Sequence, residues 1–164
     1  MLKSITILVD TREHEGKNDH ILNYFDSHKI PWKKMKLEYG DYSFFIPQNT
    51  ELGILRDLYF DRHIVVERKA NLDEYAGNQA NERDRIKKEF TLAPKEKVLL
   101  IENGSYQDMV EGNYKSNYSA QSYYGTIHSF WHEYGLPVVF MPDKSYSGKF
   151  IIGYFYYYLR NIIK

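Results

Sequence analysis

Short apolar runs recur along the chain, and most of them are rich in the β-branched residues that strands favour. Residues 32–38 and 42–46 flank Tyr39-Gly40-Asp41, which predicts two strands around a tight turn. The other runs have the lengths of buried strands. The full set of predicted strands is 3–9, 32–38, 42–46, 63–69, 97–102 and 136–141.

Between the strands, apolar residues spaced three or four apart predict helices. Asn18 or Asp19 can cap the first helix, and a long helix covers residues 71–92. A third helix ends at Gly135, and the last runs from about residue 147 to the end. Because this last helix is apolar on more than one side, we expect a second subunit to cover one of those sides.

The alternation of strands and helices predicts an α/β fold with a mixed central sheet. The length of 164 residues suits one globular domain, so residues 1–164 are expected to form a single domain. Residues 47–61 predict an insertion, which is either a hairpin or a loop. Gly104 and Gly112 bracket what we expect to be a short polar loop.

The composition is that of an ordered globular protein, with 43% hydrophobic and 27% charged residues. The sequence has no cysteine, which excludes disulfides, thiolate zinc sites and a cysteine nucleophile. Lys and Arg number 22, as do Asp and Glu, and this neutral balance argues at first against a nucleic-acid partner. Residues 1–97 contain 17 basic and 17 acidic residues, so we expect the residues that carry the protein's chemistry to lie in that part of the chain.

The sequence shows no targeting or membrane-spanning segment. Its first apolar run breaks at Asp10, too early for the core of a signal peptide, and residues 150–159 are about half as long as a bilayer span. We therefore expect a soluble protein with no membrane partner. Its expected location is the cytoplasm for a prokaryotic or phage-encoded protein, and the nucleus for a eukaryotic one.

Acidic residues stand where predicted strands begin or end. Asp10 follows the first strand, Asp41 precedes the third, and Glu67 lies near the end of the fourth. Carboxylates presented from adjacent strands suit Mg²⁺ or Mn²⁺. Lys69 shares a strand face with Glu67, and its ammonium can orient a metal-bound water or stabilise developing negative charge. The pattern predicts phosphodiester hydrolysis, and its alternative is a solvated salt bridge.

Three segments surround these residues in a specific order: Val9-Asp10-Thr11-Arg12-Glu13, then Leu37-Glu38-Tyr39-Gly40-Asp41-Tyr42, then Val66-Glu67-Arg68-Lys69 with Asp73 four residues further on. Together they closely resemble the nuclease domain of the XPF/Hef-type structure-specific endonucleases. The resemblance covers roughly residues 5–160 and implies a three-layer α/β/α restriction-endonuclease-like core. It also implies metal-dependent cleavage of one DNA strand near a branch, flap or fork, in recombination, repair or phage DNA processing.

The resemblance implies a role for each matching residue. Lys69 would position the attacking water, and Arg12 and Asp73 would orient neighbours or contact the scissile phosphate. The implied metal ligands are Asp41, Glu67, the Arg68 carbonyl and Asp10. Asp10 would either complete the metal shell or support it. The implied DNA-binding residues are Arg12, Arg68, Arg83, Arg85 and Lys87. For the basic residues of the helix, the alternative is pairing with Glu82, Asp84 and Glu89 on the same helix.

The resemblance also bears on partners. Many family members carry a tandem helix-hairpin-helix module after the nuclease domain, and we expect none within residues 1–164. We expect branched, flapped, forked or single-stranded DNA as substrate, and a homodimer formed through the C-terminal helices. The alternative function is a non-catalytic DNA-binding or scaffold subunit of a nuclease complex. The presence of Asp41, Glu67, Lys69 and Asp73 favours the enzyme.

Three further groups have two interpretations each. His128 and His132 are four apart on a predicted helix, where they either share a metal or are polar positions beside an aromatic core. The lysines within residues 33–36 form a phosphate contact or a solvated strand edge. The tyrosines within residues 154–158 stack on unpaired bases or pack in a helical interface, and the second interpretation is favoured.

Overall fold

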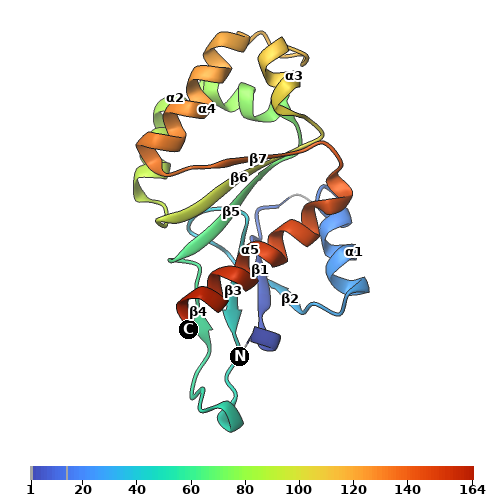
Figure 1. Cartoon of the computed structure of the whole chain (residues 1–164), viewed down its shortest axis with the longest axis vertical. Helices are drawn as coiled ribbons and strands as arrows, with labels where there is room; N and C mark the ends of the chain where they lie inside the picture. The colour runs from blue at the N-terminus through green and yellow to red at the C-terminus, as the bar shows by residue number, and fades with distance from the viewer. Residues whose placement is uncertain (1, 14) are drawn as a thin grey trace.

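The structure, a computed structural model, describes residues 2–13 and 15–164, and these residues form one mixed sheet of seven strands (Figure 1). The strands are β1 (Thr6–Val9), β2 (Trp32–Lys34), β3 (Tyr42–Ile46), β4 (Leu58–Tyr59), β5 (Ile64–Lys69), β6 (Glu96–Glu102) and β7 (Val138–Met141). Their order is β2-β1-β3-β5-β6-β7, with β4 paired to β3. The pairs of β3 are antiparallel, whereas β1 with β2, β5 with β6, and β6 with β7 are parallel.

Helices cover both faces of the sheet, which confirms the predicted three-layer α/β fold (Figure 1). The helices are α1 (Asp19–Ser27), α2 (Leu72–Leu92), α3 (Tyr106–Glu111), α4 (Ala120–Tyr134) and α5 (Ser147–Ile162). Short 3₁₀ turns are η1 (Leu2–Ser4), η2 (Thr50–Leu52) and η3 (Lys144–Tyr146). Helices α1 and α5 pack on one face, and α2 and α4 pack on the other, with α3 beside α4.

Side-chain alternation along β5 and β6 divides the core into two parts. Val66 and Val98 pack with α1 and α5, whereas Leu99 packs with α2 and α4. Because successive side chains of a strand point to opposite faces, Glu67 and Lys69 project toward the α2 side. The apolar pattern of the buried strand therefore determines which face carries the charged pair.

The predicted pair of strands around a tight turn is wrong, because β1 lies between β2 and β3. Strand β2 ends at Lys34, and the chain then crosses over the end of β1. The Met35 amide donates to the Val9 carbonyl at 2.9 Å, and the Leu37 amide donates to Asp10 Oδ1 at 2.9 Å. These bonds hold the connection against β1, so it cannot close into a hairpin.

The insertion at residues 47–61 is a hairpin, one of the two predicted alternatives. Strand β4 pairs with the end of β3, with Phe45 opposite Tyr59 and Ile46 opposite Leu58. The hairpin extends away from the layered body at the end of β3 that lies opposite Asp41 (Figure 1). This position separates the insertion from the predicted catalytic residues.

The polar loop predicted between Gly104 and Gly112 is instead helix α3. Ser105 and Asp108 form a reciprocal capping box, in which each side chain accepts from the backbone amide of the other residue. Gly112 ends the helix in the left-handed conformation, with φ of 71°. The Ser-x-x-Asp spacing before Met109 was the sequence signal for this helix.

Other elements depart from the prediction only locally. Residues 3 and 4 belong to η1 rather than to the first strand, and α2 is interrupted at Glu82, which has φ of −136° and ψ of 24°. Helix α5 buries Ile151 and Phe155 against the sheet and leaves Tyr157 57% exposed. Within residues 2–13 and 15–164, no helix has the length and apolarity needed to cross a bilayer.

Candidate active site

Asp41 is fixed at the junction of three strands. Its carbonyl accepts from the Asp10 amide at 2.9 Å, and its own amide donates to the Val66 carbonyl at 2.8 Å. The preceding Gly40 has φ of 74°, and a Cβ there would lie 2.7 Å from Val65 Cβ. Only glycine therefore allows the chain to approach β5 this closely. The result is that Asp41 lies beside β5 before any ligand is bound.

The Asp41 side chain is bonded directly to the strand that carries the other charged groups. Asp41 Oδ2 accepts from the Arg68 amide at 2.7 Å. Along a strand, backbone groups of alternate residues point to the same edge, so the Arg68 amide and carbonyl lie on the edge occupied by Asp41. Strand β3 begins one residue later, at Tyr42. The Arg68 carbonyl thus faces the Asp41 side of β5, as the implied ligand role requires.

Glu67 and Lys69 form an ion pair on the adjacent face of β5. Lys69 Nζ lies 3.5 Å from Glu67 Oε1, and the two side chains are 17% and 22% exposed, respectively. Together with Asp41 they line a cleft of about 180 Å³. The opposite wall comes from α2, through Tyr75, Asn78, Arg85, Ile86, Glu89 and Phe90. Asp10 lines the same cleft, so the structure brings four of the five predicted catalytic residues to one cavity.

Burial and the crowding of negative charge shift the pKa values of Asp41, Glu67 and Lys69. Burial, followed by repulsion from Glu67, raises the pKa of Asp41 well above its ordinary value. Burial also raises the pKa of Glu67, against the lowering effect of Lys69. Burial opposes the charge of Lys69, but Glu67 and Asp41 outweigh it and leave its pKa raised. Lys69 is thus an ammonium beside two carboxylates whose charge it does not fully balance.

Asp10 lies at the cleft with both side-chain oxygens occupied. It is 2% exposed, Oδ1 accepts from the Leu37 amide, and Oδ2 accepts from Arg12 Nε at 2.7 Å. Arg12 also donates to the Leu37 carbonyl at 2.6 Å. This closed set of bonds holds the chain segment that leads into Gly40 and Asp41. The arrangement gives Asp10 a supporting position, which is one of the two roles that the resemblance implies.

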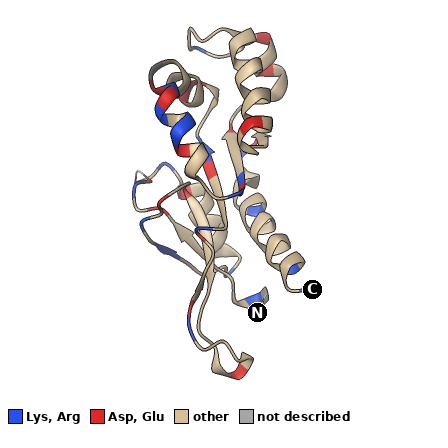
Figure 2. Cartoon of the chain, turned by 90° about the vertical axis from the view of Figure 1, so that its left-hand side faces the viewer, with Lys and Arg blue, Asp and Glu red and all other residues tan. Residues whose placement is uncertain are grey.

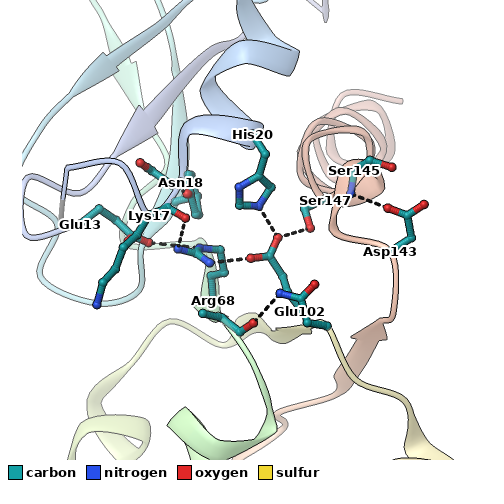
Figure 3. A network of polar contacts seen from close by, with 12 residues as sticks. Glu13, Lys17, Asn18, His20, Arg68, Glu102, Asp143, Ser145 and Ser147 are labelled. Atoms are coloured by element: carbon teal, nitrogen blue, oxygen red, sulfur yellow. Dashed lines mark hydrogen bonds and ion pairs between the residues drawn. The ribbon is translucent and has the colours of Figure 1, made fainter.

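The Arg68 side chain lies on the opposite face of the sheet from the cleft, in a buried polar network (Figure 3). Its guanidinium contacts Glu102 at 2.5 Å and donates to the Lys17 carbonyl at 3.0 Å. Glu102 also contacts His20 at 2.6 Å and accepts from Ser147. With 4% of its side chain exposed, Arg68 presents no free guanidinium to a DNA phosphate.

Asp73 lies outside the residues that line the cleft. Its Oδ1 accepts from the backbone amides of Lys115 and Ser116 at 2.8 and 2.6 Å. Asp73 therefore ties the start of α2 to the segment between α3 and α4. Of its two implied roles, this geometry corresponds to orienting neighbours.

The predicted DNA-binding residues of α2 are not equivalent. Arg83 donates to Thr126 at 3.0 Å and lies over the Phe130 ring, so it packs against α4. Arg85 lines the cleft and pairs with Glu82, while Lys87 is half-buried on the same helix. Figure 2 shows acidic and basic residues interspersed along α2.

One acidic residue of the site was missed in the sequence. Glu13 has an 11% exposed side chain, and its Oε1 lies 3.7 Å from Arg68 Nε. Its charge contributes to the raised pKa of both Asp41 and Glu67. The signal was its position in the Asp-Thr-Arg-Glu segment, three residues after Asp10. The segment thus supplies acidic charge on both sides of β5.

The donor set fits a divalent metal ion at Asp41 and Glu67. Both are oxygen donors with raised pKa values, and a cation beside them would relieve their repulsion. Within the described parts of the chain, no three Asp, Glu or His side chains are gathered closely enough to hold a metal by themselves. A bound ion would therefore also need water, substrate oxygen or the Arg68 carbonyl.

The other candidates are accounted for by local contacts. His128 contacts the Tyr106 hydroxyl at 2.9 Å, and His132 is exposed on the same helix. Lys33 lies 4.1 Å from the centre of the Phe45 ring and donates to the Tyr59 hydroxyl. Lys33 thus packs along the hairpin, and the histidine pair is not part of a described metal cluster.

The mixed sheet with helical layers on both faces defines a three-layer α/β domain with a charged cleft at β5. Residues 9–153 match the family model of the ERCC4 domain, so the chain belongs to the ERCC4 domain family. The XPF-type resemblance seen in the sequence is thereby confirmed.

Two solved structures show the same fold. XPF from Aeropyrum pernix is 17% identical with a TM-score of 0.63, covering 91% of this chain and 59% of that chain. XPF from Aeropyrum pernix in complex with DNA is 15% identical with a TM-score of 0.65, covering 95% and 66%. The present chain therefore spans less than two thirds of each. Among curated proteins, none matches the chain in sequence.

Proposed function

We propose that this chain is a divalent-metal-dependent endodeoxyribonuclease that cleaves one DNA strand near a branch, flap or fork. The observation that carries the proposal is the grouping of Asp41, Glu67 and Lys69 at one cleft in a member of the ERCC4 domain family. The fold likeness to an XPF solved in complex with DNA supports DNA as the substrate. Recombination, repair and phage DNA processing are the pathways in which such cleavage is used.

Asp41, Glu67 and the Arg68 carbonyl would hold the metal. A bound Mg²⁺ or Mn²⁺ supplies a Lewis acid for the phosphoryl oxygen and lowers the pKa of a coordinated water. Lys69 remains an ammonium, because Glu67 and Asp41 raise its pKa, and it can orient the attacking water and stabilise negative charge on the phosphate. The walls of the cleft restrict bulk water around these groups.

The test is cleavage of labelled flap, fork, four-way junction, single-stranded and duplex DNA, with Mg²⁺, with Mn²⁺ and with a chelator. We expect metal-dependent cutting of a branched form, and a loss of about a hundredfold or more in Asp41→Asn and in Lys69→Ala. Lys3→Ala is the matched control, because this exposed lysine lies before the start of β1, whereas the cleft lies at the other end of that strand. Full cleavage by either site variant, or equal loss in the control, contradicts the assignment.

The same panel separates the enzyme from a non-catalytic DNA-binding or scaffold subunit. A scaffold binds a branched form with the same affinity with or without metal and cuts none of the forms. The charged group at the cleft favours the enzyme, because a scaffold has no use for two half-buried carboxylates that repel one another beside a lysine. Binding without cleavage across all metals would establish the scaffold function.

We also propose a homodimer formed through α5. The outer side of this helix and the residue that follows it expose large apolar groups, with Tyr157 57%, Ile162 53% and Ile163 45% exposed. Such groups lose contact with water when a second copy covers them. Light scattering at micromolar concentration should give the mass of two chains, and Tyr157→Asp combined with Ile162→Asp should give one. A monomeric mass for the unaltered chain contradicts the dimer.

A further inference from the structure

The end of β5 that carries the charged residues of the cleft is paired with another strand on one side only. Its pairing with β6 continues to Lys69. On the other side, β3 pairs with β5 at one position in the described residues, where Tyr42 lies opposite Val66. Beyond that position, the Arg68 amide bonds to the Asp41 carboxylate instead of to a strand. Strand pairing alone therefore does not fix the orientation of this end of β5.

The Arg68 side chain anchors the same end of β5 from the opposite face of the sheet (Figure 3). Because side chains alternate along a strand, Arg68 points away from the cleft that Glu67 and Lys69 line. Its guanidinium donates to Glu102 Oε1 at 2.5 Å and to the Lys17 carbonyl at 3.0 Å. The donors of a guanidinium form a rigid planar fork, so two acceptors from different segments fix its position. The backbone of this residue is thereby held from the far face as well as from its edge.

Glu102 is held in turn by both helices on that face of the sheet. Its Oε2 contacts His20 Nε2 of α1 at 2.6 Å and accepts from the hydroxyl of Ser147, the first residue of α5. Glu102 is 1% exposed, and Ser147 is fully buried. The packing of α1 and α5 on the sheet therefore determines where the guanidinium of Arg68 lies.

Stability alone does not account for this network. Apolar residues of the same volume usually stabilise a fold as well as a buried ion pair does, because taking two charges out of water is costly. Arg68 Nε has no hydrogen-bond partner in the described residues, and its ion-pair contact with Glu13 measures 3.7 Å. What the pair with Glu102 adds over apolar packing is a fixed geometry. The residue whose geometry it fixes lies between two residues of the cleft.

We propose that Glu102, supported by His20 and Ser147, is a positioning residue for the metal site. It acts through Arg68 and touches neither metal nor substrate. By holding the guanidinium, it keeps the Arg68 carbonyl on the Asp41 edge of β5 and keeps the two neighbouring charged side chains directed into the cleft. The inference rests on the proposed metal-dependent function and adds the residues that hold its ligands in place.

The test compares variants that separate geometry from stability. Glu102→Gln keeps the shape of the side chain and removes its charge. Arg68→Met combined with Glu102→Leu replaces the whole pair by apolar residues, retains the backbone carbonyl at position 68 and should remain folded. Phe155→Ala is the control for lost stability, because Phe155 is a fully buried ring on the same face of the sheet that packs on Phe44. Urea unfolding measures the stability of each variant.

Two readouts report on the site itself. Calorimetry measures the affinity for Mn²⁺, and NMR measures hydrogen exchange of the amide at position 68 relative to the buried Leu99 amide, which bonds to the Pro137 carbonyl. We expect both network variants to bind Mn²⁺ about 10- to 100-fold more weakly, since residues that orient metal ligands have effects of this size. The amide at position 68 should exchange about tenfold faster relative to Leu99. Phe155→Ala should change neither quantity.

The double variant decides the inference, even where Glu102→Gln fails to fold. Unchanged relative exchange at position 68 would overturn the positioning role, as would unchanged Mn²⁺ affinity in a chain that binds the ion. Equal changes in Phe155→Ala would overturn it as well, because lost stability would then account for the effect. If the unaltered chain binds no Mn²⁺, the proposed metal-dependent function fails, whereas the exchange at position 68 still decides whether Glu102 positions β5.

Discussion

Gly40→Ala tests whether close packing of the turn on β5 sets the position of Asp41. An alanine at φ of 74° costs about 1–2 kcal/mol of backbone strain. Its Cβ would also lie 2.7 Å from Val65 Cβ and 3.2 Å from the Val66 carbonyl oxygen, which adds about 1–3 kcal/mol of overlap. The expected loss in the free energy of unfolding is therefore about 2–5 kcal/mol.

Gly53→Ala is the matched control. Gly53 has φ of 71°, but a Cβ there meets no atom within 4 Å. This variant should lose only the backbone term, about 1–2 kcal/mol, and should keep full cleavage. Urea unfolding followed by circular dichroism measures both losses, and cleavage is compared at a temperature where both variants are folded. Equal losses of stability, or normal cleavage by Gly40→Ala, would refute the argument from close packing.

Three further outcomes follow from the site and its support. Asp41→Asn should raise the free energy of unfolding of the metal-free protein at pH 7 by about 0.5–2 kcal/mol, and its melting temperature with it. The reason is that the folded state raises the pKa of Asp41, so the ionised carboxylate is unfavourable there. Below the pKa of the unfolded chain, Asp41 is protonated in both states and carries no penalty; as pH rises, ionisation in the folded state becomes costly. The advantage of Asn should therefore vanish near pH 3.8, the ordinary pKa of Asp, and thermal melts from pH 3 to 8 test this. Glu102→Gln should cost about 3–5 kcal/mol, because it leaves the buried Arg68 charge with only the more distant carboxylate of Glu13, and urea unfolding measures the loss. Asp73→Ala should speed hydrogen exchange at the Lys115 and Ser116 amides, and unchanged exchange there would contradict the tethering role.

The sequence predicted the strands and helices that carry strong periodicity, and it predicted the residues that meet at the cleft. Asp41, Glu67 and Lys69 could be placed together because strand alternation and a glycine turn are local properties. The pairing of β2 with β1 could not be predicted, because strand order depends on contacts between distant residues such as Leu37 and Asp10. Local pattern therefore predicted the elements better than their arrangement.

The surroundings of single charges were also beyond the sequence. Arg68 follows Glu67 directly, yet its side chain enters the buried network on the other face of the sheet. Asp73 resembled a catalytic residue, but it binds backbone amides more than forty residues away. Each of these features depends on tertiary packing rather than on spacing.

The backbone bonds of Asp41 have a consequence for how the site responds to heat. Its amide is bonded to β5, its carbonyl to the end of β1, and its carboxylate to the Arg68 amide. The site can therefore open only when β3 separates from β5 and from the end of β1, so its opening is coupled to separation of the central strands. We expect the amides of Asp41 and Arg68 to exchange hydrogen as slowly as the core. Activity should then persist up to the melting temperature and disappear together with the fold.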